Sequence, residues 1–196
     1  HHFPDQIIEF LDSNNNFGIN LHISDESDQL LDTGGAILRV ASRLLSHDHI
    51  LVHNADIFSD IDLSMIVKHH LLSKADATLL TSCRKSSRQL VFNQQRHLKG
   101  WINSISDERI PDTLQIDPDN DRLRSFNGIH VITPAIVKWI QNHPQQGSFP
   151  IIPQYIAMSQ ELSINSFTPD FDYTWVDIGR PDSLKLAQTI ASSHRK

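Results

Sequence analysis

The sequence has few of the residues and patterns that mark several common classes of protein. It contains one cysteine, Cys83, so an internal disulfide framework and a cluster of metal-binding thiolates are both excluded. No stretch approaches the roughly 18 consecutive apolar residues of a transmembrane helix. The first residues also lack a signal-peptide pattern. We therefore expect a cytoplasmic protein with no membrane segment.

Basic residues are scarce relative to acidic ones, since 17 Lys and Arg stand against 23 Asp and Glu, for a formal net charge of −6. This balance argues against nucleic acid as a partner. A divalent cation could still bring a nucleotide to an acidic site. Glycine is also scarce, at 7 residues, and neither a G-x-G-x-x-G nor a Walker sequence occurs. The dinucleotide-binding and P-loop motifs are therefore absent.

Apolar segments of strand length instead alternate with helical patterns along the 196 residues. Strands are predicted at 19–24, 50–54, 75–83, 88–93, 98–103, 124–133, 162–167 and 174–179. Helices are predicted at 4–12, 33–45, 63–73, 134–143, 149–160 and 181–193, and residues 104–124 form a polar loop. This alternation predicts an α/β fold with a largely parallel sheet, in a single domain.

Two aspartates each close an apolar strand, Asp56 in "ILVHNAD" and Asp177 in "TWVD". In α/β sheets, ligands bind beyond the carboxyl ends of the strands. Mg²⁺ takes one or two protein carboxylates together with water and substrate phosphates. We therefore predict that Asp56 and Asp177 share a Mg²⁺ site, with simple turn capping as the alternative.

Two further motifs lie at predicted helix starts. In Thr33-Gly34-Gly35, the glycines would let the backbone approach a flat ligand or a phosphate closely, and the alternative is a plain N-cap at Thr33. Asp60 and Asp62 spell D-x-D, the metal–nucleotide signature of many glycosyltransferases. An N-cap at Asp62 explains that motif more simply.

Two more features have both a structural and a functional interpretation. Arg84, Lys85 and Arg88 follow a predicted strand and form either a solvated basic turn or a contact to a second phosphate. His130, inside "FNGIHVI", is either a packed strand residue or one that lines a site.

Four segments in order resemble the sugar-1-phosphate nucleotidyltransferases: "LLDTGGAI", "LVHNADIFSDIDL", "FNGIHVITPAI" and "WVDIGRPDSLKLAQ". The likeness is greatest to bacterial members that act on N-acetylmuramate 1-phosphate or mannose 1-phosphate, and it extends to about residue 190. It implies a Rossmann-like three-layer sandwich with a mostly parallel mixed sheet, as in nucleotide-diphospho-sugar transferases. The implied activity is Mg²⁺-dependent joining of an NTP (UTP or GTP) and a sugar 1-phosphate into an NDP-sugar, with release of pyrophosphate.

The resemblance also implies roles for individual residues. Asp56 and Asp177 would be the catalytic ligands of Mg²⁺. The residues implied at the nucleotide are Thr33, Gly34, Gly35 and Asn54, and those at the sugar are Asn127, Gly128, Arg84 and Arg88. Many relatives carry Glu-Lys-Pro, whose lysine contacts the sugar phosphate, where this chain reads "GWIN" at 100–103. The two arginines are assigned to the sugar as replacements for that lysine.

The chain differs from the resembled family at its start. Such enzymes begin with a strand and a glycine-rich loop that carries an Arg and a Lys for the triphosphate, and this N-terminal βαβ portion is missing here. We expect either a piece of a longer enzyme or a degenerate one. Two alternatives therefore stay open: a catalytically silent nucleotide-sugar-binding or regulatory module, and a D-x-D glycosyltransferase. A monomer and a homo-oligomer are equally compatible with the sequence.

Overall fold

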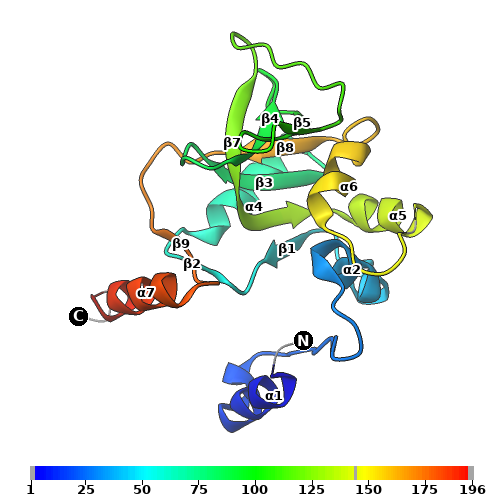
Figure 1. The fold of residues 1–196 in the computed structure, drawn as a ribbon. Helices are drawn as coiled ribbons and strands as arrows, with labels where there is room; N and C mark the ends of the chain where they lie inside the picture. The colour runs from blue at the N-terminus through cyan, green and yellow to red at the C-terminus, as the bar shows by residue number, and fades with distance from the viewer. Residues whose placement is uncertain (1–2, 144, 194–196) are drawn as a thin grey trace.

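The computed structural model describes residues 3–143 and 145–193. The helices are α1 (Pro4–Ser13), the 3-10 helix η1 (Asn15–Gly18), α2 (Asp32–Arg39), α3 (Ala41–Leu44), α4 (Leu63–Ser73), α5 (Pro134–Asn142), α6 (Ile151–Met158) and α7 (Pro181–Ser193). The strands are β1 (Ile50–His53), β2 (Ile57–Ser59), β3 (Ala77–Ser82), β4 (Arg88–Phe92), β5 (Leu98–Asn103), β6 (Glu108–Ile110), β7 (Arg122–Ile132), β8 (Ile164–Phe167) and β9 (Trp175–Asp177). Figure 1 shows their arrangement.

The main sheet has the strand order β6-β5-β4-β7-β3-β8, with β1 also paired to β7, while β2 and β9 form a separate two-stranded sheet. The α/β class is confirmed, but the expected parallel sheet is wrong. Among the described strands, only β3 and β8 pair in parallel. The reason is β7, because its Val131 lies opposite both Leu51 of β1 and Thr78 of β3. The long strand therefore lies between β1 and β3 and runs antiparallel to both.

Helices cover both faces of this sheet, which confirms the three-layer arrangement. Alternate residues of a strand point to opposite faces, and both faces of the central strands are apolar. Leu79 and Ile132 face the core cluster that includes α2, α5 and α6. Leu80 and Ile129 face the second cluster, which includes Ile66 of α4. Burial on both faces accounts for the near-continuous apolar sequence of these strands.

Most predicted elements are present, but three details of the prediction are wrong. Residues 19–24 form no strand. The predicted helix at 33–45 is broken at Val40, which ends α2 and precedes α3. The predicted polar loop at 104–124 contains the short strand β6, which pairs with β5.

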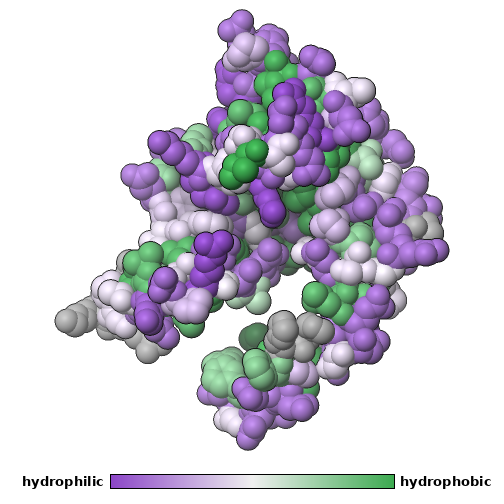
Figure 2. Space-filling model, viewed as in Figure 1, coloured by the Kyte–Doolittle hydropathy of each residue, from purple (hydrophilic) through white to green (hydrophobic). Residues whose placement is uncertain are grey.

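The lower part of the molecule is loosely packed. Neither α1 nor η1 buries a residue, and Figure 1 shows α1 apart from the sheet. Apolar residues lie at the surface of α1 and α7 in Figure 2, among them Phe10 and Leu186. Among the described strands, β1 has only β7 as a neighbour. No helix within the described residues is long and apolar enough to cross a bilayer.

Candidate functional site

The structure brings Asp56 and Asp177 together at the small β2–β9 sheet. Asp56 lies in the turn between β1 and β2, and Asp177 ends β9. The antiparallel register places Ile57 opposite Asp177. The N–H of Ile178 donates to the backbone oxygen of Asp56 at 2.8 Å. Backbone pairing therefore holds two residues that are distant in sequence side by side.

The two carboxylates face the same small space beside Gly179. A Cβ atom placed on Gly179 would lie 3.1 Å from Oδ1 of Asp177 and 3.9 Å from Oδ2 of Asp56. The N–H of Gly179 donates to Oδ1 of Asp177 at 3.0 Å, which fixes that carboxylate. Both aspartates are exposed to solvent. The predicted convergence of the pair is present in the geometry.

This pair suits a hard divalent cation better than a transition metal. No group of three or more His, Cys, Asp or Glu residues within the described part of the chain could hold a metal ion. Mg²⁺ does not need such a group, because it commonly keeps several waters and takes its remaining ligands from substrate phosphates. Two exposed carboxylates that face one space fit that requirement. The role of Asp56 and Asp177 as Mg²⁺ ligands stays a prediction.

Arg84 lies beside Asp177 and lines the same cleft. Its guanidinium lies over the ring of Trp175, 4.2 Å from the centroid, and its Nη2 donates to the backbone oxygen of Phe126 at 3.0 Å. Burial lowers the pKa of Arg84, and the negative charge of Asp177 opposes that shift. Arg84 is thus a cation held in place by an aromatic face, close to the carboxylate pair.

Asn127 connects the residues around Arg84 from inside the protein. Its side chain is fully buried. Its Oδ1 accepts the hydroxyl of Ser82 at 3.1 Å, and its Nδ2 donates to the hydroxyl of Tyr173 at 2.6 Å. Its backbone oxygen accepts the indole N–H of Trp175 at 2.9 Å. The structure therefore shows a structural role for Asn127, and a contact with a sugar stays a prediction.

Gly128 allows the turn that carries Asp56 to approach β7. Its φ is +74°, and an added Cβ would lie 2.8 Å from the side chain of Ile57 and 3.3 Å from Nδ2 of Asn54. The N–H of Asn54 donates to the oxygen of Gly128 at 2.9 Å. Both residues thus hold the β1–β2 turn at the sheet. Their predicted contacts with substrate stay predictions.

A cleft of about 610 Å³ opens next to Asp177. Its lining includes three arginines, two tryptophans and the aspartate: Arg84, Arg88, Arg180, Trp101, Trp175 and Asp177. The two arginines that the sequence analysis placed near a phosphate therefore share one cleft with a member of the carboxylate pair. Arg180 and Trp101 were missed as lining residues. The position of Arg180 directly after "VDIG" was the available signal for it, and for Trp101 it was the place of "GWIN" where relatives carry Glu-Lys-Pro.

The Thr33-Gly34-Gly35 segment lies elsewhere, in α2. Figure 1 shows α2 and the β2–β9 sheet on opposite sides of β1. The predicted N-cap at Thr33 is wrong, because Leu31 occupies the N-cap position and makes no side-chain cap. Gly34 is buried against Phe149, whose ring would lie 2.5 Å from an added Cβ. Close helix packing thus accounts for Gly34, and contact with a nucleotide stays a prediction.

Both aspartates of the D-x-D sequence are engaged in backbone contacts. Oδ1 of Asp60 accepts the N–H of Thr174 at 2.7 Å, which ties the end of β2 to the start of β9. Asp62 is the N-cap of α4 and accepts the N–H of Ser64 at 2.9 Å. The hydrogen bonds that Asp62 accepts from the N–H and the hydroxyl of Ser64 lower its pKa. The expected capping role of Asp62 is confirmed.

No family model and no curated protein matches the sequence. Solved structures do match. HddC from Yersinia pseudotuberculosis has a TM-score of 0.69 and 17% identity, over 95% of this chain and 73% of that one. A putative glucose-1-phosphate thymidylyltransferase from Bacillus anthracis, in complex with sucrose, has a TM-score of 0.68 and 16% identity, over 96% and 72%.

A second structure of HddC from the same organism, complexed with GMP-PN, has a TM-score of 0.64 and 16% identity, over 95% of this chain and 73% of that one. At this identity the matches establish a shared fold. They support the predicted α/β fold class.

Proposed function

We propose that this chain transfers a nucleotidyl group from UTP or GTP to a sugar 1-phosphate in the presence of Mg²⁺. The observation that carries the proposal is the convergence of Asp56 and Asp177 beside an arginine-lined cleft. Two structural neighbours support it, since one is a putative glucose-1-phosphate thymidylyltransferase and another is bound to GMP-PN. One fold can host several chemistries, so the reaction is identified by the residues of the site.

The reaction needs positioning and charge neutralisation more than proton transfer. A phosphate oxygen of the sugar 1-phosphate attacks the α-phosphorus of the NTP and forms the new P–O bond. The bond from the α-phosphorus to its bridging oxygen breaks, and pyrophosphate leaves with that electron pair. The nucleophile is already anionic at neutral pH. No side chain has to act as a general base.

The residues of the site fit these requirements. Asp56 and Asp177 would hold Mg²⁺, which when bound supplies Lewis-acid stabilisation of phosphate charge. Arg84 is held by the ring of Trp175, and with Arg88 and Arg180 it provides positive charge for the phosphate of the sugar. The apolar faces in the same cleft suit the ring of a sugar.

The test is neutralisation of each aspartate without a change of shape. In the full natural protein, Asp56→Asn and Asp177→Asn should each lower Mg²⁺-dependent pyrophosphate release by about 10²-fold or more, because the electrostatic contribution dominates. The assay would pair UTP or GTP with a panel of sugar 1-phosphates. Unchanged turnover in either variant would refute the assignment of that aspartate.

The D-x-D sequence provides a matched control. Asp62→Ala removes the cap of α4 and should cost about 1 kcal/mol of stability, while nucleotidyl transfer should stay near the wild-type rate. Loss of activity in Asp62→Ala with retention in Asp177→Asn would instead favour the glycosyltransferase alternative. Calorimetric binding of a sugar nucleotide without turnover would favour a silent binding module.

A further inference from the structure

A second arginine-rich cleft, of about 470 Å³, has neither Asp56 nor Asp177 in its lining. It is bounded by the turn after β4, the first half of β7 and the segment that follows β8. Three of its lining residues are Arg96, Arg122 and Arg124. It shares no lining residue with the cleft beside Asp177. We call it the β7 arginine cleft.

Local structure explains why the three arginines meet. Arg122 and Arg124 are two residues apart on β7, so their side chains lie on one face of the strand. They stand opposite Phe92 and Leu90 of β4 in the antiparallel register. Arg96 lies in the turn between β4 and β5, and its backbone oxygen accepts the N–H of Ser166 in β8 at 3.1 Å. Backbone pairing thus fixes the three arginine positions relative to one another.

The positive charge of this cleft is poorly compensated. Arg122 donates from Nη1 to the backbone oxygens of Asp119 and Asp121, at 3.1 and 2.9 Å. Arg124 donates from Nη1 to its neighbouring backbone oxygen at 2.9 Å. These acceptors are neutral carbonyls, which orient a guanidinium without cancelling its charge.

Arg122 lies beside the acidic segment 117–121, where it contacts the backbone oxygens of Asp119 and Asp121 and not their carboxylates. Within residues 3–143 and 145–193, no carboxylate forms an ion pair with Arg96, Arg122 or Arg124. The carboxylate of Asp121 is already paired with Lys99, from Nζ to Oδ2 at 2.5 Å. Asp170 is the one acidic residue in the lining. Three cations against one anion leave the cleft positive, in a chain whose formal net charge is −6.

We propose that the β7 arginine cleft binds a phosphate anion with at least two negative charges, as a site separate from the reacting centre. Guanidinium groups form paired hydrogen bonds with phosphate oxygens, and prior orientation lowers the cost of binding. A cleft concentrates the field of several like charges at one point. A single carboxylate would leave part of this charge unmatched, whereas a diphosphate group matches it. The cleft volume is within the usual range for small-molecule sites.

The test uses inorganic diphosphate as the probe and the full natural protein without Mg²⁺. Titration calorimetry of the wild type should show saturable binding. The double variant Arg122→Gln/Arg124→Gln should weaken that binding by about 10-fold or more, since hydrogen bonds between charged groups are lost. Arg109→Gln is the matched control, because this half-buried arginine lies outside the cleft and pairs with Asp107 at 3.4 Å. Its affinity should equal that of the wild type.

Two outcomes would overturn the proposal. One is that Arg88→Gln/Arg180→Gln abolishes the binding while Arg122→Gln/Arg124→Gln retains it, since the anion would then occupy the cleft beside Asp177. The other is the absence of saturable binding at about 10 mM diphosphate. Circular dichroism would confirm that each variant is folded. These outcomes are independent of the turnover of Asp56→Asn and Asp177→Asn, so either proposal can fail without the other.

Discussion

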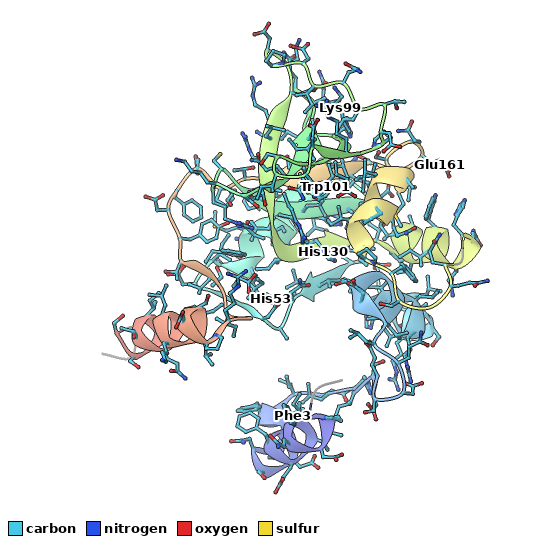
Figure 3. The ribbon with its side chains drawn as sticks, in the orientation of Figure 1. Phe3, His53, Lys99, Trp101, His130 and Glu161 are labelled. Carbon is cyan, nitrogen blue, oxygen red and sulfur yellow. The ribbon has the colours of Figure 1, made fainter. Side chains whose placement is uncertain are left out.

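At the scale of single residues, His130 is a polar side chain inside the apolar core. It lies in the central strand β7, fully buried, stacked on Phe126 and edge-on to Tyr155. Neither ring nitrogen has a hydrogen-bond partner among the described residues, and neither does the hydroxyl of Tyr155. Figure 3 shows His130 in the body of the molecule, whereas Phe3 lies at the start of the separate α1. The packed-strand interpretation of His130 is confirmed.

His130 should make stability depend on pH. Burial lowers its pKa to about 3, so the folded protein keeps the ring neutral while the unfolded chain takes up a proton below about pH 6.5. Its stabilising contribution is therefore complete above that pH and is lost progressively as the pH falls toward 3. When the pH is lowered from about 7 to about 5, the unfolding free energy of the wild type should fall by about 1 to 2 kcal/mol more than that of His130→Leu.

Urea unfolding at both pH values would measure this difference. His22→Leu is the control, since His22 is exposed, and it should keep the wild-type dependence. Equal dependence in His130→Leu and the wild type would show that His130 is hydrated in the folded state.

Sequence reasoning worked at residue scale where one residue type has a narrow chemical use. A carboxylate at the end of an apolar strand needs a reason, and Asp56 and Asp177 were found in that way. Arg180 and Trp101 were missed because exposed arginines and partly buried tryptophans have many ordinary places in a fold. Only the folded chain shows that both border the same cleft as Asp177.

At the scale of elements, local patterns predicted helices and strands well but not how they pair. The sequence of β7 has the apolar pattern of a buried strand. That pattern does not indicate whether the neighbouring strands are parallel or antiparallel to it. Strand direction depends on which segments meet, which is a property of the whole chain. The predicted strand at 19–24 failed for a related reason, since alternation without a partner strand does not form a sheet.

Helix α2 offers a test of the packing explanation for its glycines. Gly34→Ala would place a Cβ 2.5 Å from the ring of Phe149 and 2.8 Å from its backbone oxygen. We expect a loss of about 1–3 kcal/mol of unfolding free energy, because a backbone atom cannot move aside easily. Chemical denaturation followed by circular dichroism would measure the change.

Gly18→Ala is the comparison for that variant. No atom lies within 4 Å of a Cβ there, and η1 buries no residue, so the expected loss of unfolding free energy is below about 1 kcal/mol although φ is +72°. A Gly34→Ala protein as stable as the wild type would remove the packing explanation. Approach of a ligand would then be the better account of Gly34.

At the scale of the whole molecule, stability is concentrated in the sheet and the helices that cover it. The two buried clusters lie on the two faces of that sheet. By contrast, α1 buries no residue, and its main contacts are with η1. Overall composition gave no sign of this division, because the apolar residues of α1 have the same spacing as those of a packed helix.

Removal of residues 1–18 should therefore change the unfolding free energy by less than about 1 kcal/mol, since no buried side chain is lost. Ile136→Ala in α5 is the contrast, because Ile136 is fully buried and its truncation should cost about 2–5 kcal/mol. Thermal unfolding of both variants would measure the difference. A deletion as damaging as Ile136→Ala would mean that α1 contributes to the core.

Among the described strands β1 pairs only with β7, so half of its peptide groups have no partner in the sheet. Asn54 donates to Gly128 and the register continues through Val52 opposite His130, so the even-numbered residues exchange hydrogen bonds with β7. The amides and carbonyls of Leu51 and His53 therefore point outward. An exposed strand edge of this kind can pair with any extended segment that reaches it. The strand that leads to Asp56 is thus also the place where the sheet can grow by one more strand.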